Sequence, residues 1–365
     1  MKVIISGGGS GGHIFPAITI ANELKRRDNN IDILFVGAKD KMEMEKVPKA
    51  GYNIEGLWIS GFHRKLTLRN LMFPFKLLNS LWKSRSILKR FKPDVVIGVG
   101  GFASGPVLEM ATRRGIPTLI QEQNSYAGIT NKLLAKKVDR ICVAYDQMER
   151  FFPKNKIIKT GNPVRQDIND LDDKKSEARA YFDLSQNKKM ISIFGGSLGA
   201  RTLNIAMRES EALLKAHPEV EVLWQAGKLY IDEYSKSNTA QLPNVSCQAF
   251  VDRMDYAYAA SDIIIGRAGA STISELCIAG KAAILIPSPN VAEDHQTKNA
   301  KALVDKSAAL LIANKDASAS MIQSALDLLN NTGQIQTLES NIKKLALPNA
   351  AEQIVDEILK LVKST

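Results

Sequence analysis

The chain carries two successive series of short apolar segments, separated by segments with helical patterns. The first series comprises residues 3–6, 31–36, 95–99, 118–121 and 141–144, and the second comprises residues 190–194, 221–225, 245–249, 263–265, 282–286 and 309–312. Short apolar runs that alternate with helices predict parallel sheets with helices on both faces. Because 365 residues are about twice the usual domain length, we expect one doubly wound α/β sheet for each series.

The boundary between the two predicted domains falls at residues 161–165 (GNPVR), which are followed by a polar, acidic run over residues 167–176. This composition is typical of a hinge and linker. We therefore expect an N-terminal lobe over residues 1–161 and a C-terminal lobe over residues 162–346. Residues 347–365 have the pattern of an amphipathic helix that could pack on either lobe, and we expect it to return to the N-terminal one.

Three glycine-rich loops occur where a predicted strand meets the following helix: residues 6–13 (SGGGSGGH), 98–106 and 195–201. Glycines allow tight turns and close backbone approach, and a helix N-terminus attracts phosphate. Loops at the carboxyl ends of parallel strands share one edge of a sheet, where open α/β sheets bind ligands. We expect these loops to line the two walls of a cleft that holds a pair of diphosphate-bearing substrates.

The first loop satisfies the pattern G-x-G-x-x-G through Gly7, Gly9 and Gly12. A dinucleotide-binding domain would also need an acidic residue at the end of the second strand, to bind the ribose. That strand ends at residues 35–38 (FVGA), which contain no carboxylate. The sequence therefore argues against NAD or FAD.

Residues 266–275 (GRAGASTISE) place small residues at the start of a helix and an acidic residue, Glu275, near its first turn. A carboxylate in this position can accept hydrogen bonds from both hydroxyls of a ribose. It can equally serve only to complement the helix dipole. The residues alone leave both interpretations open.

The net charge of +11 is concentrated in one segment. Between Glu55 and Asp94 there are nine cations and no acidic residue: Arg64, Lys65, Arg69, Lys76, Lys83, Arg85, Lys89, Arg90 and Lys92. Large apolar residues share this segment, with Leu71, Phe75, Leu78 and Trp82 at helical spacing.

This pattern predicts either a helix that faces the core or one that docks on an anionic membrane. In the second case the contacts are Phe73, Phe75, Lys76, Trp82, Lys83 and Arg85. Nucleic acid is disfavoured as a partner, because no recognition helix, zinc spacing or RNP-type aromatic motif accompanies the charge.

The sequence also favours a reducing compartment. Cys142, Cys247 and Cys277 stand far apart within apolar runs, which predicts buried free thiols. The N-terminus begins directly with a strand pattern, so we expect no export signal. No apolar run reaches the roughly 20 residues needed to cross a bilayer, so any membrane contact is expected at the surface.

The loops, together with residues 121–124 (QEQN), 161–165, 266–275 and 294–296 (DHQ), resemble the MurG family, the bacterial transferases that add N-acetylglucosamine to lipid I to form lipid II. The resemblance runs in order over essentially the whole chain. It implies the GT-B fold, with two doubly wound Rossmann-like lobes facing across a cleft. It also implies UDP-N-acetylglucosamine as donor, lipid I (undecaprenyl-pyrophosphoryl-N-acetylmuramoyl-pentapeptide) as acceptor, and peripheral attachment to the cytoplasmic face of the bacterial plasma membrane, with anionic lipids as partners.

The resemblance also assigns site residues. The implied donor contacts are Ser10, Gly11, Gly12, Asn124, Arg165, Ser197, Val251 through its backbone, Ala270, Ser271, Thr272, Ile273, Ser274, Glu275 and Gln296. The implied contacts to the acceptor diphosphate are Gly9, Gly12, Gly100, Gly101 and Ser104. Within these sets Glu275 binds the ribose, Ser197 the phosphate and Gln296 the sugar hydroxyls.

The chain departs from the family pattern at three positions. Gln121 stands where histidine is common, Ser10 stands where threonine is common, and His295 replaces the first of two adjacent glutamines.

Transfer with inversion requires a base for the acceptor hydroxyl and stabilisation of the leaving diphosphate. His13 is the candidate base because its titration range suits the task. It could instead position substrate as a neutral imidazole, or be structural. No Asp-x-Asp occurs in a plausible metal-holding loop, so we expect helix N-termini, loop amides and Arg165 to stabilise the diphosphate, with no metal or cofactor. The alternatives are a UDP-N-acetylglucosamine 2-epimerase, another glycolipid transferase, or a non-catalytic protein that binds a nucleotide sugar or nucleic acid.

Overall fold

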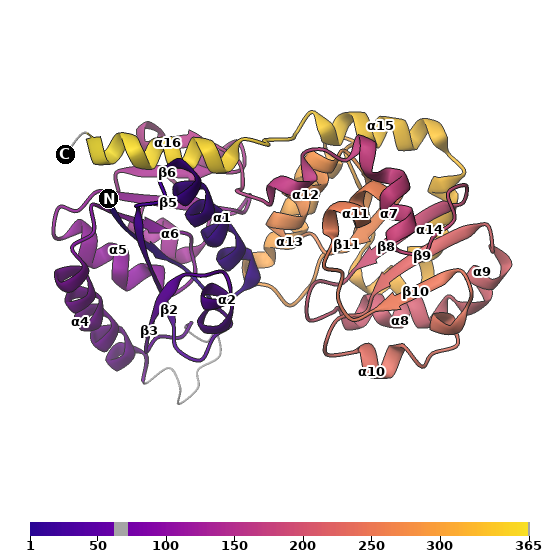
Figure 1. Ribbon diagram of the computed structural model, residues 1–365, viewed down its shortest axis with the longest axis horizontal. Coiled ribbons are helices and arrows are strands. Elements are labelled where there is room, and N and C mark those ends of the chain that lie inside the picture. Colours follow the sequence, from indigo (N-terminus) through magenta and orange to yellow (C-terminus); the bar gives the residue numbers. More distant parts are fainter. Residues whose placement is uncertain (62–71, 364–365) are drawn as a thin grey trace. The chain divides into compact units, whose positions relative to one another are not determined.

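The computed structural model describes residues 1–61 and 72–363. The chain divides into two compact units, each with its own sheet. Unit 1 comprises residues 1–164 and 349–365, and unit 2 comprises residues 165–348 (Figure 1).

Unit 1 is built on a seven-stranded parallel sheet with the strand order β3-β2-β1-β4-β5-β6-β7. Its strands are β1 (Lys2–Ser6), β2 (Asp32–Ala38), β3 (Asn53–Leu57), β4 (Val95–Gly98), β5 (Thr118–Glu122), β6 (Arg140–Val143) and β7 (Ile157–Lys159). Its helices are α1 (Gly11–Arg27), α2 (Glu43–Lys49), α4 (Phe73–Phe91), α5 (Ser104–Thr112), α6 (Ile129–Leu134) and α16 (Ala350–Lys363).

The central strand of this sheet is buried on both faces. Val3 and Ile5 of β1 belong to one apolar cluster, and Ile4 belongs to the other. Successive side chains of a strand point to opposite faces, so a continuous apolar run is what a strand between two helical layers requires.

Helix α16 closes one face of unit 1 beside α1 (Figure 1). Ile354, Val355 and Ile358 are fully buried in the cluster that also holds Val3 and Ile5. Helices α1 and α16 therefore pack side by side on the same face of the sheet.

Unit 2 has a six-stranded parallel sheet with the order β10-β9-β8-β11-β12-β13. Its strands are β8 (Lys189–Phe194), β9 (Val220–Gln225), β10 (Val245–Gln248), β11 (Ile263–Gly266), β12 (Ala282–Leu285) and β13 (Leu310–Leu311). Its helices are α7 (Lys175–Tyr181), α8 (Arg201–Glu209), α9 (Glu211–Ala216), α10 (Ile231–Tyr234), α11 (Met254–Ala260), α12 (Ala270–Ala279), α13 (His295–Val304), α14 (Ala317–Leu329) and α15 (Thr332–Lys343).

The two sheets share one winding pattern, which confirms the predicted doubly wound α/β class. In each sheet the early strands follow one another toward one edge and the later strands follow one another toward the other edge. The direction changes between β1 and β4 in unit 1 and between β8 and β11 in unit 2. Ligands of open α/β sheets bind at the carboxyl ends of the strands beside this switch point. The glycine-rich loops follow β1, β4 and β8, and residues 267–269 follow β11, so all four loops lie at the two switch points.

Two strands and one linker differ from the sequence prediction. Strands β3 and β7 were not predicted, because both include half-buried or charged positions and β7 has only 3 residues. The polar run at residues 167–176 is not an extended linker. It forms two short 3-10 turns and the start of α7, held in place by Ile168, which is fully buried.

Candidate active site

The two glycine-rich loops of unit 1 press against each other backbone to backbone. A Cβ atom on Gly101 would collide with the carbonyl oxygen of Gly8, and one on Gly9 would lie 2.9 Å from the Phe102 ring. Gly101 also has a φ of +80°, a conformation that other residues rarely adopt. Glycine is therefore required at this crossing of the loops after β1 and β4.

His13 lies in the first turn of α1, directly after the first loop. Its Nδ1 atom is 3.1 Å from the carbonyl oxygen of Gly8 and 3.1 Å from Oγ of Ser10. A carbonyl oxygen can only accept, so this geometry assigns the proton of the neutral ring to Nδ1 and the lone pair to Nε2. The absence of a side chain at Gly100 leaves room for the Nε2 side of the His13 ring, since a Cβ on Gly100 would lie 3.0 Å from Nε2.

Two of the residues predicted to contact the diphosphate form hydrogen bonds within unit 1. The N–H of Gly9 donates to the Glu43 carboxylate, at 3.2 Å and 3.1 Å from its two oxygens. Ser104 is fully buried, and its hydroxyl donates to the carbonyl of Gly101 at 2.9 Å. Both groups brace the loop conformation. Among the described residues, the amides of Gly11 and Gly12 have no acceptor, as is usual in the first turn of a helix.

The segment of residues 121–124 forms a buried amide network at the carboxyl end of β5. The side-chain amide of Gln121 donates to Asn162 at 2.9 Å, and Gln121 accepts from the amide of Gln123. Asn162 in turn donates to the carbonyl of Gln123 at 3.0 Å. Gln121, which stands where histidine is common in the family, is therefore a buried hydrogen-bond partner of Asn162.

The Glu122 carboxylate shapes the loop that carries Asn124. It accepts from the backbone N–H of Asn124 at 3.1 Å, from the N–H of Gly128 at 3.0 Å and from the side chain of Asn131 at 2.9 Å. No separate role was predicted for Glu122, which lies within residues 121–124. Its function here is to fix the backbone of a predicted donor contact.

In unit 2 the structure brings Arg165 and Glu275 together. Nε of Arg165 lies 3.9 Å from one carboxylate oxygen of Glu275, and the hydroxyl of Tyr258 donates to the other at 2.8 Å. The Glu275 side chain is 19% exposed, and this burial raises its pKa, while the hydrogen bond from Tyr258 acts in the opposite direction. Burial also raises the pKa of Tyr258 well above its usual range, so this group stays a donor.

One expectation about Glu275 was wrong. Helix α12 begins at Ala270, which places Glu275 in the second turn, and no acidic residue occupies the first turn. The favourable effect of a carboxylate on the helix dipole is confined to the first turn. The dipole interpretation therefore loses its basis, and the ribose interpretation remains.

Ser271 lies one helical turn before Glu275 on the same face of α12. Its hydroxyl oxygen is buried and has no hydrogen-bond partner among the described residues. A buried hydroxyl without a partner costs about 1–3 kcal/mol. A ligand that bonded to this hydroxyl would recover part of that free energy.

Gln225, at the end of β9, connects two further predicted donor contacts. Its amide donates to the carbonyl of Gly196 at 3.0 Å, within the loop that carries Ser197, and its oxygen accepts from the N–H of Val251 at 2.8 Å. The backbone contact expected from Val251 is thereby restricted to its carbonyl group. Sequence reasoning did not identify Gln225.

Gln296 is positioned by a strained loop. Glu293 and Asp294, which come just before His295 and Gln296, both adopt the left-handed conformation, with φ of 55° and 50°. Such conformations cost about 1–3 kcal/mol each and concentrate at functional sites. The Gln296 oxygen accepts from the N–H of Ser288 at 2.8 Å, which directs its amide nitrogen elsewhere.

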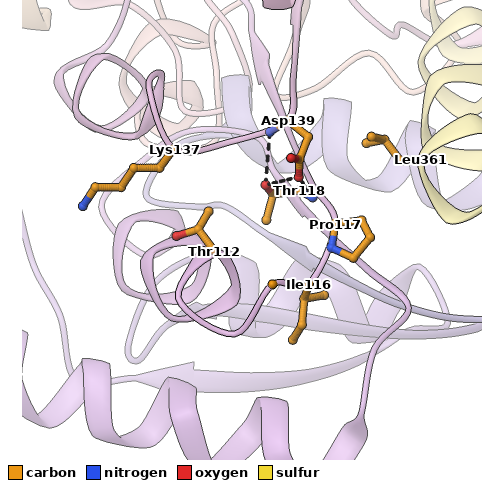
Figure 2. Close-up of a pocket in the computed structure, with 8 residues that line it drawn as sticks. Thr112, Ile116, Pro117, Thr118, Lys137, Asp139 and Leu361 are labelled. Carbon is orange, nitrogen blue, oxygen red and sulfur yellow. Dashed lines mark hydrogen bonds between the residues drawn. The ribbon is translucent and has the colours of Figure 1, made fainter. Parts of the chain in front are cut away.

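A pocket of about 280 Å³ lies in unit 1 at the amino-terminal end of β5 (Figure 2). Asp139 there accepts from the backbone N–H and the hydroxyl of Thr118, at 2.8 Å and 2.9 Å. Lys137, which also lines the pocket, donates to Glu109 at 2.6 Å. The pocket faces the edge of the sheet opposite His13, and its charged groups are already paired, so it is not the candidate site.

The apolar side chains of α4 face outward. Phe75, Leu78 and Trp82 are 63%, 65% and 79% exposed at helical spacing, whereas Ser80 and Ser84 on the other face are buried. This excludes the interpretation of these residues as a core stripe. The predicted residues Leu71, Arg64, Lys65 and Arg69 lie outside the described residues.

Two of the predicted cations on α4 are held against β3 and the residues that follow it. Nζ of Lys83 donates to the carbonyl of Gly56 at 2.7 Å, and Nζ of Lys76 donates to Ser60 at 3.1 Å and lies 5.7 Å from the ring centre of Trp58. Trp58 is itself 41% exposed and was not predicted. We define the α4 face as Trp58, Met72, Phe75, Leu78 and Trp82.

Two features are absent from the described residues: a cluster of metal ligands and a helix that could cross a membrane. No three or more His, Cys, Asp and Glu side chains there are grouped so that they could hold a metal ion. None of the described helices combines the length and the apolar character needed to cross a bilayer.

Comparison with known proteins identifies relatives along the whole chain. The glycosyltransferase family 28 N-terminal domain matches residues 3–143, and the glycosyltransferase family 28 C-terminal domain matches residues 190–354. A protein of Flavobacterium psychrophilum is 59% identical, with 100% of this chain and 98% of that protein covered. Its name is UDP-N-acetylglucosamine--N-acetylmuramyl-(pentapeptide) pyrophosphoryl-undecaprenol N-acetylglucosamine transferase.

Two solved structures have the same fold. The crystal structure of MurG from Acinetobacter baumannii matches with a TM-score of 0.78 and 29% identity, over 98% of this chain and 99% of that one. A UDP-N-acetylglucosamine 2-epimerase from Neisseria meningitidis, bound to UDP-N-acetylglucosamine, matches with a TM-score of 0.67 and 17% identity, over 99% and 100%. The second similarity shows the fold alone.

Proposed function

The chain belongs to glycosyltransferase family 28, and from this premise we propose its reaction: it transfers N-acetylglucosamine from UDP-N-acetylglucosamine to the C4 hydroxyl of the muramoyl sugar of lipid I, forming lipid II for peptidoglycan synthesis. The observation that carries this assignment is the 59% identity to a transferase of that name over the whole chain. The clustering of Arg165, Glu275 and Tyr258 at the switch point of unit 2 supports it.

The donor nucleotide is assigned to unit 2. Glu275 would accept hydrogen bonds from the ribose hydroxyls, with Tyr258 and Arg165 fixing the carboxylate. The hydroxyl of Ser271, which has no partner within the part of the chain that the structure describes, lies on the same helical face and offers one more contact. Ser197 and the N-terminus of α8 would bind phosphate, and the carbonyl of Val251 would bind the base.

The acceptor is assigned to the loops of unit 1. The amide of Gly12 and the loop at Gly100 and Gly101 would hold its diphosphate. Nε2 of His13 would take the proton of the C4 hydroxyl as its oxygen attacks the anomeric carbon. The bond from that carbon to the UDP oxygen breaks with inversion, and UDP leaves with the electron pair.

No metal ion is required in this scheme. Arg165, loop amides and helix N-termini would stabilise the charge that develops on the leaving diphosphate. Arg165 is 40% exposed and its partners lie at 3.7 Å and 3.9 Å, so its guanidinium can turn toward a phosphate without breaking a close ion pair.

The α4 face would dock on the cytoplasmic face of the plasma membrane. It combines exposed aromatic and aliphatic side chains with nearby cations, including Lys76, Lys83 and Arg85. Aromatic and aliphatic groups that enter the interface beside cations suit an anionic bilayer. An undecaprenol-linked acceptor, as named for the relative, resides in such a bilayer.

The decisive experiment incubates the protein with labelled UDP-N-acetylglucosamine and a lipid I analogue. The expected products are a labelled disaccharide lipid and free UDP in equal amounts. Release of UDP or an epimerised sugar without the disaccharide would assign the chain to the epimerase alternative. Binding of the labelled donor with no turnover would overturn the enzymatic assignment.

A further inference from the structure

A second carboxylate lies under the first glycine-rich loop, and the reaction scheme has no role for it. Glu43, the first residue of α2, is 1% exposed. It accepts from the N–H of Gly9 with both oxygens, at 3.2 Å and 3.1 Å, and from the N–H of Ala38 at 3.0 Å. Among the described residues, no cation forms an ion pair with it. A buried carboxylate without a countercharge depends on these amides for its solvation.

The chain provides the space for this carboxylate by omitting side chains around it. A Cβ on Gly8 would collide with the Glu43 carboxylate, and one on Gly37 would lie 2.6 Å from Cγ of Glu43. Gly8 also has a φ of +150° and Gly9 a φ of +86°. The fit of the loop around Glu43 therefore depends on Gly8 in the first glycine-rich loop and on Gly37 in β2.

The hydrogen bonds of Glu43 and His13 meet on one peptide group. The N–H of Gly9, which donates to Glu43, and the C=O of Gly8, which accepts from Nδ1 of His13 at 3.1 Å, are the two ends of the same amide. The carboxylate, the peptide group and the imidazole therefore form a continuous hydrogen-bonded chain. Consecutive hydrogen bonds polarise one another, and they do so more strongly where water is excluded.

We propose that Glu43 is a positioning residue of the transfer reaction that acts on His13 through the Gly8–Gly9 peptide. Its negative charge draws the peptide N–H toward itself and increases the negative charge on the Gly8 oxygen. This strengthens the bond from Nδ1–H of His13 and keeps the lone pair on Nε2. When Nε2 takes the proton of the acceptor hydroxyl, the same chain stabilises the imidazolium that forms.

The catalytic part of this inference rests on the proposed function, whereas the assignment of the tautomer does not. The position of the proton on the His13 ring can be measured on the protein alone, by ¹⁵N NMR of the imidazole nitrogens in the neutral state. His13→Gln identifies the signals of this ring. In the wild-type protein we expect the proton on Nδ1. A wild-type ring with its proton on Nε2 would overturn the proposal, whatever the activities of the variants.

The key variant is Glu43→Gln, which keeps the shape and removes the charge. We expect a mixture of the two His13 tautomers and a kcat about 10- to 100-fold lower, a part of the roughly 10²- to 10⁴-fold that a positioned general base contributes. KM for both substrates should stay within about 2-fold, because neither substrate touches Glu43. Glu43→Asp keeps the charge and should restore Nδ1 protonation and part of kcat. It also serves as the test if the glutamine variant fails to fold.

Glu45→Gln is the matched control, because Glu45 lies two residues away on α2 and is 60% exposed. It should leave the tautomer and kcat unchanged. A Glu43→Gln protein with reduced kcat but its proton still on Nδ1 would show that Glu43 only braces the loop, and would overturn the proposal. A wild-type protein that makes no disaccharide would instead contradict the proposed function, while the tautomer measurement would still decide whether the relay exists.

Discussion

The hydroxyl of Tyr258 and the carboxylate of Glu275 are joined by a hydrogen bond of 2.8 Å between α11 and α12. Tyr258 is 1% exposed, so its hydroxyl has no access to bulk water and is fixed toward Glu275. The carboxylate is thus held in one orientation before any ligand binds. Preorganisation of this kind removes part of the entropic cost of binding.

Glu275→Gln should weaken donor binding and stabilise the fold. Loss of the charged acceptor for the ribose hydroxyls should raise KM for UDP-N-acetylglucosamine roughly 10- to 100-fold, the effect of about 1.5–3 kcal/mol. Burial raises the pKa of Glu275 in the folded state, so this group lowers stability increasingly as the pH rises from the ordinary pKa of a glutamate to that raised pKa. A neutral amide avoids this cost, and we expect the Tm at pH 7 to rise by about 1–4 °C.

The pH dependence supplies the internal check on this variant. At a pH below the ordinary pKa of a glutamate the side chain is neutral in both the folded and the unfolded state, so the difference in Tm should shrink as the pH falls toward that range. Glu209→Gln, at an exposed position of α8, should change neither Tm nor KM. A Tm difference that grows in acid would contradict the burial argument.

His13→Ala should lower kcat by about 100-fold or more, because it removes the nitrogen that takes the proton from the acceptor. KM for the donor should change little. The measurement is steady-state kinetics with both substrates varied. A loss of only a few-fold would mean that His13 positions substrate or supports the loop and is not the base.

Gly101→Ala should inactivate the enzyme through the loop crossing. The new Cβ would collide with the carbonyl oxygen of Gly8 and displace it from Nδ1 of His13. We expect kcat to fall by about 100-fold, the usual effect of misplacing a catalytic group by about 1 Å. Gly51→Ala is a matched control, because Gly51 has a similar φ of +86° but nothing within 4 Å of its would-be Cβ. It carries the backbone strain without the collision and should retain full activity.

Removal of divalent cations should leave the activity unchanged, since the scheme stabilises the leaving diphosphate with Arg165 and amide dipoles. The assay is disaccharide formation in excess EDTA, compared with added Mg²⁺ or Mn²⁺. Strict dependence on either cation would reject the metal-free scheme.

Trp82→Ser should reduce binding to vesicles that contain anionic lipid by about 10-fold, as expected from the loss of about 1.5 kcal/mol of apolar burial. The measurement is co-sedimentation with the vesicles at low ionic strength. Leu229→Ser is the control, because Leu229 is also exposed, at 69%, but lies in unit 2. Equal losses in both variants would remove the α4 face as the docking surface.

Much of this architecture could be predicted from the sequence because it depends on local patterns. The apolar runs identified both sheets, and the glycines identified the loops at both switch points. The family resemblance is confirmed by the relatives. The direction of α4 could not be predicted, because residues at i+3 and i+4 mark one face of a helix without saying whether that face is buried. Ser80 and Ser84 on its opposite, buried face resolve the question.

The unpredicted site residues act through tertiary contacts. Glu43 and Glu45 are indistinguishable within the run KMEMEK, yet one is buried under a loop and the other is exposed. Tyr258 belongs to an apolar helix, where an aromatic side chain indicates only packing. Its importance follows from a carboxylate 17 positions further along the chain.

The return of α16 to unit 1 determines when this protein can finish folding during synthesis. A ribosome makes residues 165–348 before it reaches Ile354, Val355 and Ile358, which cover one face of the first sheet. Until then the apolar surface beside α1 has no cover, although every strand of that sheet has already emerged. Unit 2 can complete its own core first, so the second half of the chain is ready before the half that precedes it.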